Sequence, residues 1–319
     1  MTYVYIDWNV FDAIKKINTN SIDVYTEINN LIIDNKIIAP YSNAHISDLY
    51  RGYLKNSSYI DSDLEIIQKI TNGLCLTQYW GENSARWHYR SPLDFFQDML
   101  NESNFPKKDF SELFSFDDTS PVLENMGKAQ LNLLRLQQLP KEFKSIYQQD
   151  NIFSLIFPKS RIEMNLLALC ADIYDLSFKM QKDFALYKSL RKYLTQAKLK
   201  FPKLAKSINE SEKGMFKEPK QLIWDDLFEL FKPKFKESSN PNYDKIINLF
   251  ISTDLKGYNK DERFANMLDD ALHTFYAAHC DYFISNDVRC MEKAKLVYKK
   301  LGIQTVIVKP EEFVKLFNK

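Results

Sequence analysis

Residues 2–7 read Thr-Tyr-Val-Tyr-Ile-Asp, a stretch in which β-branched and aromatic residues run up to a single acid. This composition predicts a short buried strand that ends at Asp7. Apolar side chains then recur at helical spacing, at Val10, Phe11, Ile14 and Ile17. A buried strand that passes directly into an amphipathic helix is typical of the start of an α/β domain.

The next residues repeat this alternation. A second helix is expected to start near Ser21, and residues 36–40 (Lys-Ile-Ile-Ala-Pro) are expected to form a second short strand. Ser42 then serves as the N-cap of a helix that carries His45 and Asp48. The order of strand, helices, strand and helix favours a parallel sheet.

The C-terminal end of the chain has the same character. A helical pattern over residues 264–280 leads into a strand at residues 281–286, which ends at Asp287. A helix and a further strand follow, at residues 288–301 and 304–308. Pro310 opens a last helix, where its missing N–H is not needed.

Strand patterns are scarce in the middle of the chain. Helical periodicity dominates there, at residues 125–138, 160–199 and 221–232. We therefore predict one α/β domain built from both chain ends, with an all-α insertion whose ends lie close together in the parent fold. The expected boundaries are residues 1–80 and 257–319 for the α/β domain and residues 81–256 for the insertion.

Four carboxylates are expected at one edge of the sheet. Asp7 and Asp287 each end a strand, and the carboxyl ends of parallel strands share an edge where ligands bind. Asp270 lies on the helix before the second of these strands, and Asp48 on the helix after residues 36–40. Clustered carboxylates repel each other without a cation, which is usually a hard divalent ion such as Mg²⁺ or Mn²⁺. One or two such ions would activate water for phosphodiester hydrolysis.

Three stretches of the chain resemble the PIN-domain nucleases. Residues 3–11 are similar to the family's opening strand, with Asp and Asn two apart, and residues 40–49 resemble its strand-to-helix segment. Residues 270–287 resemble its helix-opening Asp, small helical residues and apolar strand followed by Ser, one residue and Asp. The resemblance covers about the first 75 and the last 60 residues. It implies a PIN-like fold and a metal-dependent endonuclease that acts on RNA, the substrate of most such proteins.

The resemblance also implies the roles of individual residues. The catalytic acids that coordinate Mg²⁺ or Mn²⁺ would be Asp7, Asp48, Asp270 and Asp287. Asn9 would orient a carboxylate or a metal-bound water, and Ser285 would support the same group. Asp48 departs from the family, which usually has Glu here, and its shorter side chain admits contact through water. The neighbouring Asp269 is an alternative to Asp270 as ligand, although the spacing to Asp287 favours Asp270.

Two histidines each lie three residues from a proposed ligand. On a helix this spacing puts His45 on the face of Asp48 and His273 on the face of Asp270. Both positions suit a donor to the metal ligands or to a phosphate. We favour an ordinary packed, hydrogen-bonded role for each, because histidine is commonly half-buried.

A basic stretch lies in the expected insertion. Between Lys179 and Lys206 there are nine Lys or Arg residues and one acid, Asp183. Aromatic residues alternate with them, of which Phe184 and Tyr187 are expected in the core. A stretch of this charge suggests attraction to a polyanion, and a solvated helix face is the alternative interpretation. The candidate nucleic-acid-binding residues are Lys188, Arg191, Lys192, Lys198 and Lys200.

Composition excludes several other classes of protein. The net charge of +1 over 319 residues says nothing about partners, and 45% hydrophobic residues suffice for a folded core. The four cysteines include no CxxC pair, so a zinc site is not expected and free thiols are. The chain has neither a basic signal-peptide start nor an apolar run of ~18 residues, so we expect a cytoplasmic protein without membrane association.

Competing functions remain open at this level. A PIN-like fold that has lost catalysis would serve as a nucleic-acid-binding or scaffolding module, and a nuclease directed at DNA is an alternative to one directed at RNA. A DxD phosphatase is disfavoured because Asp7-Trp8-Asn9 lacks the second Asp, and Walker and GxGxxG motifs are absent. An inhibitor or regulatory protein and a second copy of the chain are further partners to consider, and the residues identify neither.

Overall fold

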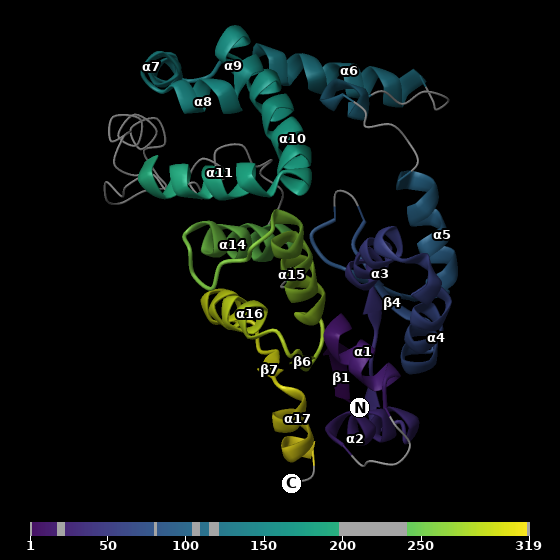
Figure 1. Ribbon diagram of the computed structural model, residues 1–319. Helices are drawn as coiled ribbons and strands as arrows, with labels where there is room; N and C mark the ends of the chain where they lie inside the picture. Colours follow the sequence, from purple (N-terminus) through teal and green to yellow (C-terminus); the bar gives the residue numbers. More distant parts are fainter. Residues whose placement is uncertain are drawn as a thin grey trace. The chain divides into compact units, whose positions relative to one another are not determined.

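The computed structural model describes residues 2–17, 23–79, 82–103, 109–114, 121–197 and 241–317. The chain divides into two compact units. The first contains both chain ends: residues 1–105, 232–261 and 265–319. The second contains residues 106–231 and 262–264. The ends of the chain therefore fold together, and most of the middle forms a unit of its own (Figure 1).

The first unit mixes strands and helices. Its N-terminal part contains β1 (Thr2–Ile6), α1 (Trp8–Lys15), α2 (Val24–Ile33), β2 (Ile37–Ile38), β3 (Tyr41–Ser42), α3 (Asn43–Lys55), a 3₁₀ turn (Ser57–Tyr59), α4 (Ile60–Thr71), β4 (Leu74–Thr77), β5 (Arg86–Tyr89) and α5 (Pro92–Ser103). Its C-terminal part contains α14 (Tyr243–Leu255), α15 (Phe264–Ala277), β6 (Tyr282–Ile284), α16 (Val288–Leu301), β7 (Val306–Val308) and α17 (Pro310–Phe317).

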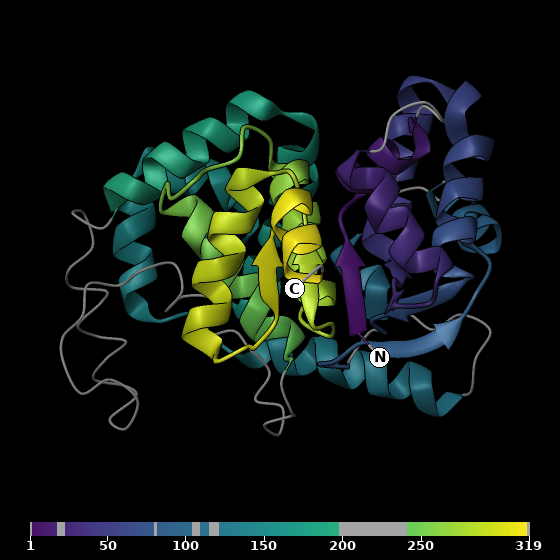
Figure 2. The ribbon, with the colours of Figure 1, turned by 90° about the horizontal axis from the view of Figure 1, so that it is seen from below.

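A four-stranded parallel sheet has the strand order β2-β1-β6-β7. Strand β1 lies between β2 from its own end of the chain and β6 from the other end, with Tyr5 opposite Phe283 and Ile6 opposite Ile284. The arrows of β1 and β7 point the same way in Figure 2. The α/β class and the parallel sheet predicted from the sequence are confirmed.

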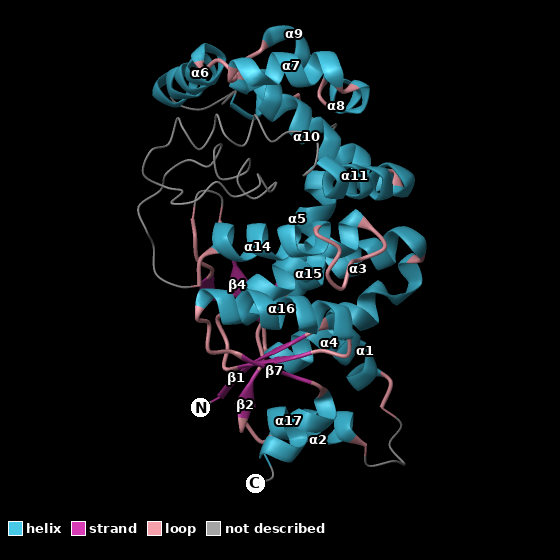
Figure 3. Ribbon diagram, turned by 90° about the vertical axis from the view of Figure 1, so that its left-hand side faces the viewer, coloured by secondary structure: helices cyan, strands magenta, loops and turns pink. Residues whose placement is uncertain are grey.

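Alternation along the strands gives the sheet two buried faces. Val4 and Ile6 of β1 join one core cluster together with Ile284, Val308 and Phe313. The intervening Tyr5 is also buried and contacts the ring of Phe283. Figure 3 shows α2 and α17 on one side of the strands and α16 on the other. Helices on both faces explain why the strands are apolar almost throughout.

A second sheet begins where the first one ends. The strand predicted at residues 36–40 is shorter than expected, because β2 spans only Ile37–Ile38. A further strand, β3, follows Ala39-Pro40 and pairs with β4 rather than with β1. Pro40 has no N–H to donate, which interrupts the ladder. Strand β5, which the sequence analysis missed, pairs antiparallel with β4. Immediately after β3, Ser42 caps α3 as predicted, and its hydroxyl accepts the N–H of Ala44.

All the described elements of the second unit are helical. They are a 3₁₀ turn (Phe110–Phe114), α6 (Pro121–Leu136), α7 (Lys141–Gln149), α8 (Asn151–Ile156), α9 (Pro158–Glu163), α10 (Leu166–Lys182) and α11 (Phe184–Ala197). Buried Asp172 on α10 fixes the start of α9, because its carboxylate accepts the N–H groups of Lys159 and Ser160. The helical pattern at residues 221–232 lies outside the described residues.

Several domain and helix boundaries in the structure differ from those predicted. Residues 81–105 and 232–256, which we assigned to the insertion, belong to the first compact unit and supply β5, α5 and α14. The helix expected at residues 264–280 ends at Ala277, whereas that at residues 288–301 has the predicted bounds. Helical periodicity did not reveal the change of unit, because α14 is as regular as the helices of the second unit.

Candidate metal centre

Asp7 stands at the carboxyl end of β1 and is held there by two side chains. The Asn9 amide donates to Oδ2 of Asp7 at 2.6 Å, and the Ser285 hydroxyl donates to the same oxygen. Oδ1 has no hydrogen bond among the described residues. The side chain is only 8% exposed. The carboxylate is therefore fixed in orientation, with one oxygen available to a ligand.

The loop after β6 is tied to the same group. Oδ1 of Asn9 accepts the N–H of Asn286 at 3.0 Å, and the Ser285 hydroxyl accepts the N–H of Asp287 at 2.9 Å. One carboxylate oxygen of Asp287 caps α16 by accepting the N–H groups of Arg289 and Cys290. Asp287 thus serves a structural role with Oδ1 and leaves Oδ2 outside the cap.

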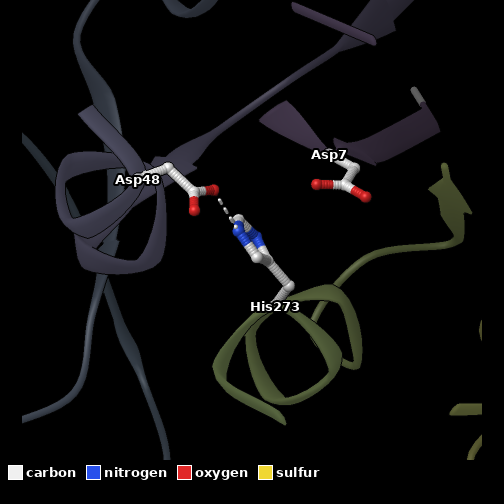
Figure 4. A group of neighbouring side chains, drawn as sticks. All are labelled: Asp7, Asp48 and His273. Carbon is white, nitrogen blue, oxygen red and sulfur yellow. Dashed lines mark hydrogen bonds and ion pairs between the residues drawn. The ribbon is translucent and has the colours of Figure 1, made fainter. Parts of the chain in front are cut away.

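Asp48 and His273 face Asp7 from two helices (Figure 4). Nε2 of His273 on α15 lies 2.9 Å from Oδ2 of Asp48 on α3. One ligand atom of each of these three residues lies within 4.8 Å of the other two. Two carboxylates and an imidazole at such distances could hold a metal ion. His273, which we favoured as an ordinary packed residue, belongs to this group.

Arg51 distinguishes Asp269 from Asp270. Its guanidinium pairs with both Asp48 and Asp269. Arg51 was not among the residues expected at the site, although its place one turn after Asp48 was a signal. The carboxylate of Asp270 has no hydrogen bond or ion pair among the described residues. Asp270 is therefore the acid of this pair that a cation would find free.

The acids of the site differ in the direction of their pKa shifts: the pKa of Asp48 is lowered, and those of three other acids are raised. Burial acts to raise the pKa of Asp48, but the hydrogen bond from His273 and the charge of Arg51 outweigh it and lower the pKa. Burial raises the pKa of Asp7, and the charges of Asp48 and Asp287 raise it further.

Asp270 resembles Asp7 in having a raised pKa. Burial and the negative charges of Asp261, Asp287 and Asp7 hold the pKa of Asp270 well above its usual range. For Asp269, burial raises the pKa to about 6 against the opposing charge of Arg51. Acids that disfavour each other's ionisation in this way are stabilised by a bound cation.

A buried hydrogen-bonded network supports His273. Its Nδ1 lies 2.9 Å from the hydroxyl of Tyr5, which is in turn 2.7 Å from the hydroxyl of Ser42. His45 completes the network: its Nε2 donates to the carbonyl of Ile6, and its Nδ1 accepts the N–H of Ser42. A carbonyl can only accept and an N–H can only donate, so His45 is neutral with its proton on Nε2. Both ring nitrogens of His45 are engaged, and it plays the packed role that we favoured.

A second buried ionic group lies on α16. The ammonium of Lys293 is fully buried and pairs with Asp254, at 2.9 Å, and with Asp261. Its charge lowers the pKa of Asp270, against the raising effect of burial. Lys293 was not expected to be buried, because nothing in the sequence distinguishes it from the other lysines of this Lys-rich helix.

The candidate nucleic-acid-binding residues have different environments. Lys188 and Lys192 are exposed, and Lys188 lies 3.3 Å from the carboxylate of Glu262. Arg191 is only 8% exposed, which corrects our expectation that it lies on the surface; its guanidinium packs over the ring of Tyr187 at 5.1 Å. The two remaining candidates, Lys198 and Lys200, lie outside the described residues.

The aromatic residues of this stretch also differ. Tyr187 is buried as predicted, whereas Phe184 is 40% exposed and was wrongly expected in the core. The alkyl part and guanidinium of an arginine can cover a buried ring, which explains how Arg191 lies beside Tyr187 at an apolar position.

Comparisons with known proteins give no relatives. No protein-family model, no curated protein and no solved structure matches the chain. Within the described part of the chain, none of the helices is long and apolar enough to cross a membrane. The four cysteines are free thiols, three of them buried, as expected.

Proposed function

We propose that the chain is a metal-dependent endonuclease of the PIN-like class, with RNA as its favoured substrate. The observation that carries the proposal is the grouping of Asp7, Asp48 and His273 at the carboxyl edge of a parallel sheet built from both chain ends. Ligands of open α/β sheets bind at this edge. The order of the acids along the chain and the hydrogen bonds of Asn9 and Ser285 to Asp7 support the resemblance on which the class is based.

The donor set suits a divalent cation. Asp7 offers Oδ1 to the group that it forms with Asp48 and His273. Asp270 lies outside that group of atoms, but its carboxylate has no hydrogen-bond or ion-pair partner among the described residues and interacts electrostatically with Asp7, so it is a further candidate ligand. Both acids have raised pKa values, caused first by burial, so a cation stabilises their charged forms. A bound Mg²⁺ or Mn²⁺ would supply polarisation of the phosphate and a water of lowered pKa.

The residues around the acids hold this arrangement in place. Asn9 and Ser285 restrain Asp7, and the cap of α16 restrains Asp287, so the acids need little reorganisation when substrate binds. Arg51 neutralises Asp269 and part of Asp48, which limits the negative charge that a phosphodiester must approach. In hydrolysis, water attacks phosphorus, the bond from phosphorus to the leaving oxygen breaks, and that oxygen takes a proton.

A second candidate is a PIN-like module that binds nucleic acid without cutting it. One observation favours it: Asp48 is already paired with both His273 and Arg51, so its charge is balanced without a metal. In this alternative the ion pairs are structural, and the protein binds through other surfaces such as the exposed lysines of α11.

The proposal is tested with the purified full chain and labelled single-stranded and structured RNA and DNA, in Mn²⁺, Mg²⁺ or EDTA. The Asp7→Asn/Asp287→Asn double variant should lose at least about a hundred-fold in cleavage rate, because two oxygen ligands lose their charge. Asp12→Asn is the matched control, since this acid on α1 is paired with Lys16 and is not among the proposed ligands. Its cleavage should equal that of the natural sequence.

The outcomes separate the two candidates. Cleavage that persists in EDTA or in the double variant contradicts the metal-nuclease proposal. Binding of nucleic acid without cleavage of any substrate, in either metal, favours the binding module. Cleavage of DNA but not of RNA would retain the enzyme class and change the substrate.

A further inference from the structure

His273 places a nitrogen atom in a site that we expected to be made of oxygen atoms alone. Its Nε2 is 2.9 Å from Oδ2 of Asp48, and both lie within 4.8 Å of a carboxylate oxygen of Asp7. His273 is 2% exposed and Asp7 is 8% exposed. The inference developed from this group deepens the proposed function, and rests on it only in using the same metal site.

The distances suit two ligands of one ion. Ligands at about 2.1 Å from an ion in octahedral geometry are roughly 3.0 Å apart when adjacent and roughly 4.2 Å apart when opposite. The separation of 2.9 Å between His273 and Asp48 corresponds to an adjacent pair. The ligand atoms of the three residues lie within 4.8 Å of one another. This limit is slightly larger than the distance of roughly 4.2 Å between ligands on opposite sides of an octahedral ion, and a small side-chain movement would close the difference.

Tyr5 determines which nitrogen of His273 faces the acids. Its hydroxyl lies 2.9 Å from Nδ1, and this leaves Nε2 directed at Asp48. Tyr5 cannot easily turn away, because it is fully buried and its hydroxyl is also 2.7 Å from that of Ser42. Histidine ligands of metals are oriented in this manner by a partner at the other ring nitrogen.

We propose that Nε2 of His273 gives up the proton that it shares with Asp48 to solvent and becomes a direct metal ligand, that Tyr5 is its positioning residue, and that the site consequently prefers Mn²⁺ to Mg²⁺. Mg²⁺ gives up its water reluctantly and is bound by oxygen. Imidazole suits transition metals, and Mn²⁺ also accepts the carboxylates of Asp7 and Asp48. The mixed donor set therefore discriminates between two ions that an all-carboxylate site would bind more evenly.

The ligand is identified spectroscopically on the full chain loaded with MnCl₂. Pulsed electron paramagnetic resonance should detect coupling of Mn²⁺ to an imidazole nitrogen. This coupling should disappear in His273→Gln and remain in His88→Gln, the matched control, whose histidine lies on β5 and not among the proposed ligands. Isotopic labelling of histidine with ¹⁵N should change the coupling in the natural sequence, which requires no variant to fold.

Selectivity is measured separately by titration calorimetry with MnCl₂ and MgCl₂. The natural sequence should bind Mn²⁺ at least about ten-fold more tightly than Mg²⁺, and His273→Gln should lose most of this ratio. Tyr5→Phe should weaken Mn²⁺ binding by about 10- to 100-fold and broaden the nitrogen coupling, because the ring loses its orienting partner. Circular dichroism verifies that each variant is folded.

Bound Mn²⁺ without nitrogen coupling in the natural sequence overturns the inference, as does equal affinity for the two ions. A Tyr5→Phe variant with unchanged affinity and coupling overturns the positioning role. None of these measurements uses cleavage. If Mn²⁺ is coordinated by nitrogen but the protein cleaves no nucleic acid, the inference stands and the nuclease proposal is contradicted. If the protein cleaves nucleic acid but its metal has only oxygen ligands, the nuclease proposal stands and the inference is contradicted.

Discussion

The carboxylate of Asp48 and Nε2 of His273 lie 2.9 Å apart although 225 positions separate the two residues in the chain. The pair joins α3, from the first part of the chain, to α15, from the last. Each partner favours the charged form of the other, since His273 lowers the pKa of Asp48 and Asp48 raises the pKa of His273. Burial acts to lower the pKa of His273, but the hydrogen bond to Asp48 and its charge outweigh this effect and raise the pKa. The site therefore exists only when the two ends of the chain are folded together.

Removing the partners of Asp7 should weaken metal binding. Asn9→Ala and Ser285→Ala each delete one donor to Oδ2 of Asp7, and loss of such a supporting hydrogen bond typically costs 10- to 100-fold in metal affinity. The measurement is a titration with MnCl₂. Asn286→Ala is the control, because that side chain donates to Tyr25 and not to Asp7. Equal affinity in all three variants would show that Asp7 needs no support.

Protonation of His45 should destabilise the protein below neutral pH. Burial, with the nearby charge of His273, lowers the pKa of His45 from 6.5 to about 3. The unfolded chain therefore binds a proton between these values that the folded chain does not. The contribution to stability is complete above pH 6.5 and is lost as the pH falls towards 3, by about 1.4 kcal/mol per unit.

Denaturant unfolding of the natural sequence and of His45→Gln isolates this effect. The difference between their unfolding free energies should shrink as the pH is lowered below 6.5, since glutamine does not titrate. Other acids and His273 are present in both proteins and largely cancel. A histidine resonance assigned to His45 that titrates near pH 6.5 would contradict the prediction.

Lys293 should be essential to the stability of the first unit. Lys293→Met leaves Asp254 and Asp261 buried without their shared cation, and breaking a buried ion pair on one side typically costs about 3–5 kcal/mol. Lys295→Met, two residues away on α16, removes an exposed partner of Glu292 and should cost under about 1 kcal/mol. Chemical denaturation measures both. Similar losses in the two variants would mean that the buried group is not a stabilising ion pair.

The basic stretch should divide into residues that bind and residues that pack. Neutralising Lys188 and Lys192, together with Lys198 and Lys200, should weaken nucleic-acid binding. The slope of its salt dependence should fall by roughly 0.7 for each phosphate of a single strand that the variant no longer neutralises. Arg191→Ala should instead lower stability, because its guanidinium packs against Tyr187. Unchanged binding of the lysine variant at every salt concentration would exclude α11 as a nucleic-acid surface.

The elements that sequence reasoning placed well share a local cause. Strand β1, the cap at Ser42, the bounds of α16 and the start of α17 at Pro310 each follow from a few neighbouring residues. The elements that it missed depend on distant ones. Strand β5 carries exposed residues without apolar alternation and exists because β4 pairs with it. The break at Pro40 separates two strands because each has a different partner.

The same division applies to the site. The sequence identified Asp7 from the end of an apolar strand, and Asn9 and Ser285 from their places in the resemblance. It could not choose between Asp269 and Asp270, because the choice depends on Arg51, which pairs with one and not the other. Nor could it assign His45 and His273 to different roles, since both lie three residues from an acid on a helix. Tyr5 and the carbonyl of Ile6, which contact the rings, make that distinction.

Local patterns of residues were sufficient to predict the α/β class, the pairing of the chain ends and the acids at the ends of β1 and β6, because strand composition, capping and helical spacing are local properties of the chain. The pairing of the charges became known from the fold: Asp48 pairs with His273 and Arg51, Asp254 and Asp261 pair with Lys293, and the carboxylate of Asp270 pairs with no described residue. Burial removes charged groups from water, so their energies depend on the few atoms that surround them, and those atoms come from parts of the chain that only folding brings together.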